Sequence, residues 1–357
     1  MDDREAMRRA IALAWGGWGR VGRNPLVGAL VLRDGAVVGE GFHAEFGGRH
    51  GEVAALEAAG RRARGADLVV SLEPCVHYGK TPPCTDAIVA AGIRRVVFGA
   101  RDVDPKARGG AEALRRAGVR VEPGVLEREV QAQNALFFHR FAGKNRPFVA
   151  LKLAVSLDGK IADHRGHSRW VSGGEAREYV HWLRAGFDAV AVGAGTAAAD
   201  DPSLTVRGPV EPARPPLRVI LDRRGEVPLS ATVVTTARET PTLVLLGRDV
   251  PATTRAALAA AGVEVADADG PRDAQAVLSG RGVASVLIEG GGVVAGRWLK
   301  EELVDRIYLI SAPILLGGDG VPAFAGLPGA DIEAVKPWRT VDRRTLGNDS
   351  LLVMDRP

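Results

Sequence analysis

The chain has 357 residues, of which 46% are hydrophobic and 25% are charged, with a formal net charge of +4. This length is sufficient for two domains with separate cores, and the composition is that of a soluble globular protein. The sequence has no long apolar run, begins with an acidic segment at residues 1–5 and has no basic cluster, which argues against membrane spans, a secretion signal and nucleic-acid binding.

The first residues predict a helix followed by a β-hairpin. Apolar side chains recur at helical spacing over residues 2–18, and two β-rich runs between residues 27 and 41 flank an Asp34-Gly35 turn. Asn24 lies just before the first strand and His43 just after the second. The pattern alone does not separate a role in a site from an ordinary loop role for these two side chains.

A group of potential zinc ligands follows the hairpin. His50 and Glu52 open a predicted helix, and Cys75 and Cys84 follow a predicted strand, with eight residues between the cysteines. Zinc takes imidazole nitrogen and thiolate sulfur in a tetrahedral shell, and three protein ligands leave the fourth position for water. A carboxylate beside that position can accept a proton and return it to a leaving amine. The sequence therefore predicts ligands at His50, Cys75 and Cys84 with Glu52 as proton shuttle, a variant of the zinc-dependent deaminase pattern, in which two residues separate the cysteines.

Two other interpretations of these residues are a structural zinc site and no metal site. A zinc ribbon needs four Cys or His ligands in tight pairs, and this chain has two cysteines, although His77 could complete a closed site. Predicted helix starts near Glu52 and Thr85 favour thiolates and the catalytic interpretation. With both cysteines used as ligands no disulfide is expected, which fits a reducing cytoplasm.

The remainder of the first half alternates strands with helices. This alternation predicts a three-layer α/β sandwich. The predicted strands are 66–74, 94–100 and 119–125, and the predicted helices are 52–60, 85–91 and 109–118.

Four motifs in this half resemble the deaminase half of the bifunctional riboflavin-biosynthesis deaminase/reductases. They are Asn24-Pro25-x-Val27-Gly28, His50-x-Glu52, Leu72-Glu73-Pro74-Cys75 and Thr81-Pro82-Pro83-Cys84. The wide cysteine spacing and the loop HYGKTPPC are typical of that family rather than of cytidine or tRNA deaminases. Gly51 departs from the usual alanine, and we still expect zinc to bind.

The resemblance implies a cytidine-deaminase-like α/β/α domain at residues 1–143. It implies zinc at His50, Cys75 and Cys84, and Glu52 as the proton shuttle. It also implies substrate contacts by Asn24, His43, Lys80 and Thr81. Lys80 suits a ribose phosphate because an ammonium group binds phosphate as a point charge.

The second half begins after a turn-rich segment. A helical stretch ends near Phe141, and residues 143–147 are rich in turn formers, which predicts a boundary before a domain at 147–357. Further strands and helices predict a second α/β domain. The predicted helices are a capped one at 172–185, which a strand follows, and one at 292–307. The other predicted strands are 148–162 (with a turn at 157–159), 217–225, 241–247, 283–292 and 306–318, the last closing the sheet, and 199–207 is a loop.

Two glycine-rich turns in this half imitate a dinucleotide-binding fingerprint. Gly193 and Gly195 follow a strand but lead toward Asp200-Asp201 rather than into a sustained helix, so a Rossmann interpretation fails there. The run 290–292 opens a predicted helix, where free amides could hold a pyrophosphate. Tight packing explains such a turn equally well.

Four segments of this half resemble the reductase half of the same family, whose fold is similar to dihydrofolate reductase. They are 152–162, Ser168-x-Trp170, 196–207 and 288–296. The resemblance implies NADPH contacts at Ala154, Trp170, Thr196, Asp200, Gly291, Gly292, Val293, Val294, Ala295, Gly296 and Arg297. It implies substrate contacts at Ser168, Arg184, Leu204, Arg207 and Glu289.

Several of these residues have simpler explanations. Guanidinium groups such as those of Arg184 and Arg207 match phosphate oxygens, but Trp170 could belong to the core and Glu289 could be a helix-start carboxylate. Arg223 could read the 2′-phosphate of NADPH or lie in a solvated turn. Lys152 and Glu289 are the titratable candidates around the substrate, with no acid or base assigned.

The two resemblances together imply a two-step enzyme of riboflavin biosynthesis. A zinc-dependent step would deaminate a diaminopyrimidinone ribosyl phosphate, and NADPH would then reduce its ribosyl group to ribityl, with zinc and NADPH as cofactors. The expected partner is a small phosphorylated pyrimidine, and a homo-oligomer is expected. The alternatives are a cytidine, deoxycytidylate or tRNA deaminase with an unrelated second half, a non-catalytic zinc module, and a family member with one active half.

Overall fold

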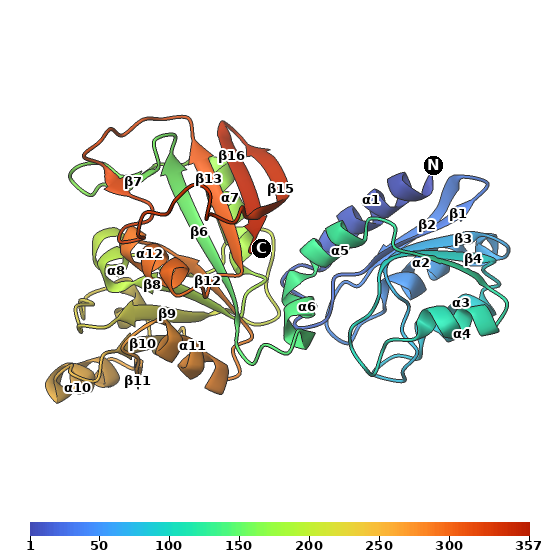
Figure 1. The fold of residues 1–357 in the computed structure, drawn as a ribbon. Coiled ribbons are helices and arrows are strands. Elements are labelled where there is room, and N and C mark those ends of the chain that lie inside the picture. Colours follow the sequence, from blue (N-terminus) through green and yellow to red (C-terminus); the bar gives the residue numbers. More distant parts are fainter. The chain divides into compact units, whose positions relative to one another are not determined.

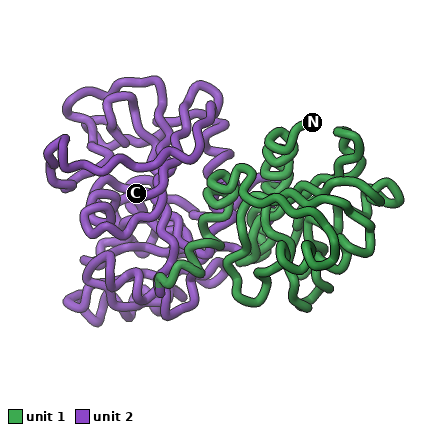
Figure 2. The backbone as a smooth tube through the Cα atoms, turned by 45° about the vertical axis from the view of Figure 1, so that its right-hand side comes forward, with its two compact units in different colours: residues 1–144, 212–214 green, residues 145–211, 215–357 purple.

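The computed structural model describes residues 1–357 and divides into two compact units. Unit 1 contains residues 1–144 and 212–214, and unit 2 contains residues 145–211 and 215–357 (Figure 2). No helix in either unit combines the length and the apolar character needed to span a membrane.

A five-stranded sheet forms the centre of unit 1. Its strand order is β2-β1-β3-β4-β5, with β1 antiparallel to both of its neighbours and β3, β4 and β5 parallel. The strands are β1 (Gly28–Arg33), β2 (Ala36–Phe42), β3 (Asp67–Leu72), β4 (Arg95–Ala100) and β5 (Arg120–Pro123). The predicted hairpin and the three following strands are all present.

Helices cover both faces of this sheet (Figure 1). α1 (Asp3–Ala14) and α5 (Glu127–Gln133) pack on one face, and α2 (Gly51–Ala59), α3 (Cys84–Ala90) and α4 (Gly110–Arg116) pack on the other; α6 (Ala135–Phe141) follows α5. Glycines on the strands allow this close approach, because a Cβ atom on Gly28 would lie 2.0 Å from the Ala10 carbonyl oxygen of α1, and one on Gly39 would lie 2.4 Å from the Ala55 carbonyl oxygen of α2. The predicted three-layer architecture is confirmed.

Unit 2 is built on a nine-stranded sheet of order β11-β10-β9-β8-β12-β6-β13-β16-β15. The first seven strands in this order are parallel, and β16 and β15 are added antiparallel. The strands are β6 (Phe148–Ser156), β8 (Ala189–Gly193), β9 (Leu217–Asp222), β10 (Thr242–Leu246), β11 (Glu264–Asp267), β12 (Ser285–Glu289), β13 (Arg306–Ala312), β15 (Arg339–Leu346) and β16 (Asp349–Asp355). A separate two-stranded ribbon pairs β7 (Lys160–Ala162) with β14 (Val321–Pro322).

The alternation of buried side chains along β8 divides the core of unit 2 in two. Ala189 and Ala191 pack toward α11 (Pro271–Gly280) and α12 (Gly292–Lys300), while Val190 and Val192 pack toward α8 (Ala194–Asp200), α9 (Thr232–Thr235) and α10 (Ala252–Ala260). All five residues of β8 are buried, as expected for a central parallel strand with helices on both faces. The predicted α/β class of this half is confirmed.

The sheet differs from the sequence-based expectation at its edge. The strand predicted to close the sheet, β13, is instead flanked by β6 and β16, with β15 beyond. β15 escapes a pattern-based prediction because its residues are polar and largely exposed.

Two local predictions in unit 2 also differ from the structure. The helix predicted from residue 172 with a side-chain cap begins at Gly174 as α7 (Gly174–Arg184), after an N-cap glycine that has no side-chain cap. A helix of two turns, α8, follows Gly193 and extends to Asp200, into the segment predicted to be a loop.

Candidate active sites

The three predicted zinc ligands converge in unit 1. His50 is the N-cap of α2, Cys84 is the first residue of α3, and Cys75 follows β3. The His50 Nδ1 atom lies 3.1 Å from the Cys84 Sγ atom and 3.5 Å from the Cys75 Sγ atom. Tetrahedral zinc with ordinary Zn–N and Zn–S bonds places such ligand atoms about 3.5 Å apart. The donor set therefore fits zinc in both chemistry and spacing.

The cluster has three members and no fourth ligand. His77, which could have completed a closed site, is not part of it, and the His77 Nδ1 atom is buried without a hydrogen-bond partner. The other ring nitrogen of His50, Nε2, lies 3.3 Å from the Thr81 hydroxyl. This contact orients the imidazole so that Nδ1 faces the sulfur atoms.

Burial controls the protonation of the groups around this cluster. Glu52 is 4% exposed, and burial together with the nearby Cys75 thiol raises the pKa of its carboxyl to about 7. A hydrogen bond from the Cys84 thiol lowers the pKa of Cys75, and the same bond together with burial raises the pKa of Cys84. The site thus holds a sulfur anion next to a carboxyl group that can exchange a proton near neutral pH.

A cavity of about 220 Å³ opens onto this cluster. All four predicted substrate contacts line it: Asn24, His43, Lys80 and Thr81. His43 Nδ1 lies 2.9 Å from the Arg49 carbonyl oxygen and Nε2 lies 3.3 Å from the Asn24 amide nitrogen. Burial lowers the pKa of His43, so a neutral ring that donates through Nδ1 and accepts from Asn24 satisfies both contacts.

Three further charged residues line this cavity, and the sequence analysis did not identify them: Asp102, Asp104 and Arg140. Asp102 and Asp104 follow β4, the parallel neighbour of β3. Because the carboxyl ends of parallel strands lie at the same edge of a sheet, this position could have identified both residues as candidates for the site. Burial raises the pKa of Asp102 to about 6. Arg140 lies on α6, and no motif or spacing in the sequence points to it.

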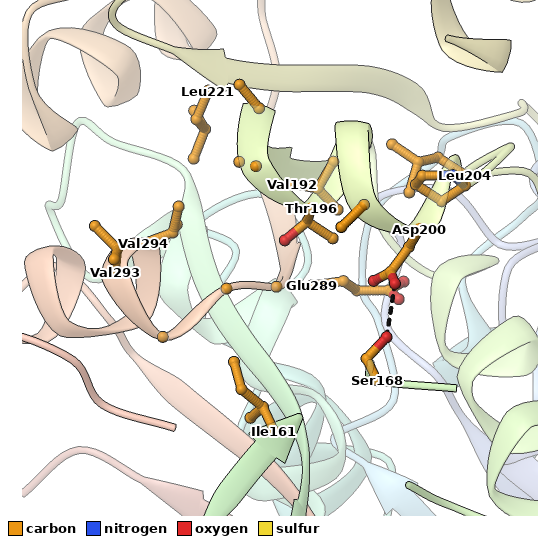
Figure 3. Close-up of a pocket in the computed structure, with 18 of the residues that line it drawn as sticks. Ile161, Ser168, Val192, Thr196, Asp200, Leu204, Leu221, Glu289, Val293 and Val294 are labelled. Atoms are coloured by element: carbon orange, nitrogen blue, oxygen red, sulfur yellow. Dashed lines mark hydrogen bonds between the residues drawn. The ribbon is translucent and has the colours of Figure 1, made fainter. Parts of the chain in front are cut away.

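A second and larger cavity, of about 1160 Å³, lies in unit 2. It is bordered by the ends of β8, β9 and β12 and by β6, the edge at which open α/β sheets bind ligands. Most of the predicted cofactor and substrate residues line it: Lys152, Ala154, Ser168, Trp170, Arg184, Thr196, Asp200, Leu204, Arg207, Arg223, Glu289, Gly291, Gly292, Val293, Val294 and Arg297. Figure 3 shows Ser168, Asp200 and Glu289 on one side of this cavity and Val293 and Val294 on the other.

Arg184 and Glu289 form a buried ion pair in this cavity. Arg184 donates through Nε and Nη2 to the two carboxylate oxygens of Glu289 at 2.5 and 2.9 Å, and through Nη1 to the Thr205 carbonyl oxygen at 2.9 Å. Burial opposes ionisation of Glu289, but the Arg184 guanidinium outweighs it and keeps the pKa of Glu289 below its ordinary value. Both groups are therefore charged, and each is held in place by the other.

Lys152 lies beside this ion pair. Burial lowers the pKa of its ammonium group, and the neighbouring Glu289 only partly compensates. A buried amine of lowered pKa can lose and regain a proton closer to neutral pH than an exposed lysine can.

The loop that carries Ser168 and Trp170 is tied to α8. The Ser168 hydroxyl donates to the Asp200 carboxylate at 2.6 Å (Figure 3). Trp170 is 68% exposed, which excludes a core role, and its ring lies 4.5 Å from the Arg177 guanidinium and 5.7 Å from that of Arg169. These two cations hold the indole at the cavity wall.

Two different structural constraints explain why glycines stand at the start of α12. Gly290 and Gly291 have φ angles of +149° and +33°, conformations that L-residues with a side chain rarely adopt. A Cβ atom on Gly292 would lie 2.1 Å from the Pro322 carbonyl oxygen. Packing thus accounts for Gly292, and the backbone bend into the helix accounts for the first two.

Two of the residues implied in cofactor binding lie away from the cavity. Ala295 is fully buried in the core of unit 2. Gly296 packs against the backbone of the segment after β14, where a Cβ atom would lie 2.0 Å from the Ala325 carbonyl oxygen. Neither lines the cavity.

The acidic residue at the end of β9 is not available to a ligand. Both carboxylate oxygens of Asp222 accept backbone amides, from Glu226 at 2.9 Å and Val227 at 2.8 Å. The next residue, Arg223, lines the cavity and pairs only loosely with Asp249, at 3.8 Å. At the end of β9 the cavity therefore meets the Arg223 guanidinium, while the Asp222 carboxylate is occupied by backbone amides.

Comparisons with known families cover both halves of the chain. Residues 147–352 match the sequence family described as RibD C-terminal domain. Residues 1–100 match the family described as cytidine and deoxycytidylate deaminase zinc-binding region.

Comparisons with individual proteins extend over the whole chain. It is 42% identical over 357 residues to the riboflavin biosynthesis protein RibD of Aquifex aeolicus, covering 99% of this chain and 98% of the relative. It is 40% identical over 336 residues to RibD of Bacillus amyloliquefaciens, covering 92% of this chain and 89% of that protein. A crystal structure of a diaminohydroxyphosphoribosylaminopyrimidine deaminase/5-amino-6-(5-phosphoribosylamino)uracil reductase from Thermotoga maritima superposes with a TM-score of 0.80 at 39% identity, covering 99% of both chains.

Proposed function

The chain belongs to the RibD family of bifunctional riboflavin-biosynthesis enzymes, and from this membership we propose which of its residues carry each reaction. It is a deaminase and reductase, with a zinc-binding deaminase domain followed by a RibD reductase domain. We assign the two reactions named for the Thermotoga maritima relative, deamination of the phosphoribosylaminopyrimidine and reduction of the resulting uracil derivative, to this chain. The alternative of a cytidine or tRNA deaminase with an unrelated second half is set aside, because the second half matches RibD.

The deamination is assigned to residues 1–143. The supporting observation is the three-ligand cluster of His50, Cys75 and Cys84 with the Glu52 carboxyl buried beside it. A zinc ion held by these ligands supplies a Lewis acid that lowers the pKa of water. Glu52, with a pKa of about 7, accepts a proton from the attacking water and delivers it to the amine that leaves as ammonia.

The other cavity residues orient the substrate and the ligands. Asn24 and the neutral His43 offer hydrogen-bonding groups to the pyrimidine. Thr81 fixes the orientation of the His50 imidazole, and Lys80 offers a cation to the phosphate.

The reduction is assigned to residues 147–357. NADPH bound in the cavity of unit 2 would supply a hydride to C1′ of the ribosyl group. Residues around β6, α8 and the start of α12 bind the cofactor: Ala154, Trp170, Thr196, Asp200, Gly291, Gly292, Val293, Val294 and Arg297. The backbone amides at the start of α12 suit a pyrophosphate, and Arg223 suits the 2′-phosphate because Asp222 is occupied by backbone amides.

The substrate of the reduction lies beside the Arg184–Glu289 pair. Ser168, Leu204 and Arg207 complete its surroundings. Since Arg184 is neutralised by Glu289, Arg207 is left as the stronger phosphate ligand. Lys152 is the proton donor best placed to serve the ring oxygen as C1′ is reduced, since its pKa is lowered and it lines the same cavity.

Two further properties are predicted for the whole chain. We expect a homo-oligomer and a location in the cytoplasm, where the Cys75 and Cys84 thiols would stay reduced for metal binding. Light scattering of the purified protein and cell fractionation test these predictions.

One incubation tests both assigned reactions. Anaerobic incubation with the diaminopyrimidinone ribosyl phosphate, followed by mass spectrometry, is expected to give the deaminated product and ammonia without NADPH. Addition of NADPH is expected to give the product with two further hydrogens. Absence of ammonia release from zinc-loaded protein would refute the deaminase assignment, and absence of NADPH consumption with the deaminated product would refute the reductase assignment.

A further inference from the structure

The deaminase cavity of unit 1 contains an arginine that forms no ion pair. Arg140 lies on α6 and lines the cavity. Its guanidinium carbon lies 4.6 Å from the centre of the Phe141 ring and 5.6 Å from that of Phe137, and Nη1 donates to the Arg23 carbonyl oxygen at 3.1 Å. No carboxylate oxygen lies within 4.0 Å of it. Four of its five N–H donors therefore remain available to a ligand.

Arg140 differs in this respect from those arginines of unit 1 that have carboxylate partners. Elsewhere in the same unit Arg95 pairs with three carboxylates and Arg101 pairs with Glu112. Asp102 and Asp104 line the same cavity as Arg140 but form no ion pair with it. One oxygen of each is occupied by a backbone amide, from Asp104 at 2.8 Å and from Lys106 at 2.9 Å. The Arg140 side chain is exposed, so its guanidinium keeps its charge and can bind a ligand that brings a negative group.

Lys80 is a second cation of this cavity that forms no ion pair. Its ammonium nitrogen lies 4.2 Å from the centre of the Phe46 ring, and it has no carboxylate partner. Both cations are thus held against aromatic faces, which attract them without neutralising them. The carboxyl groups that line the cavity, Glu52, Asp102 and Asp104, do not attract a phosphate, whereas the two cations do.

We propose that Arg140, together with Lys80, binds the 5′-phosphate of the deaminase substrate and so determines the preference for a phosphorylated pyrimidine. The guanidinium fork binds two phosphate oxygens, and the lysine adds a point charge. This inference rests on the proposed deaminase function. It adds to that function a specificity residue that lies on a helix far from the zinc motif in the sequence.

A purely structural role for Arg140 makes a different prediction. Its bond to the Arg23 carbonyl oxygen braces the segment that presents Asn24. If bracing were its whole function, loss of the side chain would weaken turnover of phosphorylated and unphosphorylated substrates to the same degree. A phosphate-binding role weakens only the phosphorylated one.

The experiment compares ammonia release from the ribosyl phosphate and from its dephosphorylated riboside, without NADPH, in wild type and Arg140→Gln. The ratio of kcat/KM for the two substrates is expected to fall roughly 10- to 100-fold in the variant, the range for losing a charge-assisted contact. If the riboside is not turned over, its inhibition constant as a competitor replaces its kcat/KM. Inorganic phosphate is expected to inhibit riboside deamination, or to compete with riboside binding, in the wild type more strongly than in the variant.

Two further variants complete the test. Arg140→Lys keeps the charge but not the fork, and is expected to retain an intermediate ratio. Arg61→Gln, an exposed arginine outside the cavity, is expected to keep the wild-type ratio. Zinc content shows whether each variant is folded around its metal, and if Arg140→Gln is not, the ratio in Arg140→Lys decides.

An unchanged ratio, or equal losses for both substrates, would overturn the inference while leaving the deaminase assignment intact. Failure of wild-type protein to release ammonia from the ribosyl phosphate would instead refute the proposed function. The two failures are therefore distinguishable in one set of assays.

Discussion

The two cavities of this protein differ in how their charged side chains are paired. In unit 1 the cavity of about 220 Å³ holds two cations without carboxylate partners, Lys80 and Arg140, and a metal-ligand cluster that includes a sulfur anion. In unit 2 the cavity of about 1160 Å³ contains a bidentate ion pair, Arg184–Glu289, already neutral in itself. The deaminase site thus depends on charges that a zinc ion and a substrate bring. The reductase site contains, besides the unpaired Arg207, a buried pair of charges that the chain itself balances.

This difference has a physical consequence for how each site fails. A cavity whose charges are completed by ligands loses function when a ligand is removed, and its fold depends on the metal as well. A cavity that balances its own charges loses stability when one partner is removed, because the other is left buried and unpaired. Five predictions test this contrast, in order of decreasing effect.

Removal of zinc is expected to abolish ammonia release and leave the reduction intact. Dialysis against a chelator strips a three-ligand site, and the reductase cavity has no metal-ligand cluster. Ammonia release and NADPH consumption with deaminated substrate measure the two activities, and zinc added back should restore the first. Parallel loss of both activities would contradict the contrast.

Replacement of Glu52 by glutamine is expected to lower ammonia release roughly 10²- to 10⁴-fold, the usual range for a general acid–base group. The amide keeps the shape of the side chain but cannot exchange the proton. Zinc content, measured by metal analysis, should stay unchanged because Glu52 is not a ligand. Glu57→Gln, on the same helix but exposed and paired with Arg49, is the matched control; a similar loss in that variant would remove Glu52 from its assigned role.

Replacement of Glu289 by glutamine is expected to destabilise unit 2 by about 3 to 5 kcal/mol, since Arg184 would remain buried without a counterion. Thermal unfolding measures the loss. The double variant Arg184→Met with Glu289→Leu removes both charges and should recover most of the stability. A double variant as unstable as the single one would show that the ion pair is not the cause.

The effect of Glu289 should also depend on pH. Its pKa is lowered in the folded state from an ordinary value of 4.5, so its contribution to stability is complete above that value and is lost as the pH falls through the lower, folded-state pKa. The stability difference between wild type and Glu289→Gln is therefore expected to narrow only below about pH 4.5. A difference that narrows between pH 6 and 8 would point to another group.

Replacement of Arg223 by alanine is expected to give the smallest effect. The side chain is 48% exposed, and water screens its attraction for the 2′-phosphate, so KM for NADPH should rise only roughly three- to tenfold. KM for NADH should not change, because NADH lacks that phosphate. Arg272→Ala, an exposed arginine paired with Glu301 outside the cavity, is the control, and equal effects on both cofactors in Arg223→Ala would argue for a general structural role.

The sequence predicted the two sites to different extents. The zinc cluster is built from motifs whose members are at most 34 residues apart, and each ligand lies at or near the start of a helix or the end of a strand. Hydrophobic periodicity predicts such boundaries well enough to bring the ligands to one edge of the sheet. The family resemblance supplied the reductase residues, but it did not indicate that Arg184 is neutralised by Glu289.

The parts of the fold that the sequence did not predict are those with a weak hydrophobic pattern. β15 is largely exposed and polar, so its strand character comes from pairing with β16 rather than from its own composition. The N-cap of α7 is a glycine whose amide donates to the Asp349 carboxylate at 2.7 Å, a partner 176 residues away that no local rule can identify.

Short-range spacing in the sequence by itself determined three things. They are the α/β class of both halves, the candidate zinc donors and the carboxylate beside them. Helix starts and strand ends are set locally, within a few residues, and so are the side chains attached to them. The tertiary structure alone decided which charges are balanced and which are free. Glu289 meets Arg184 across 105 residues, and Arg140 forms no ion pair, because the packing of distant elements decides which charged side chains meet.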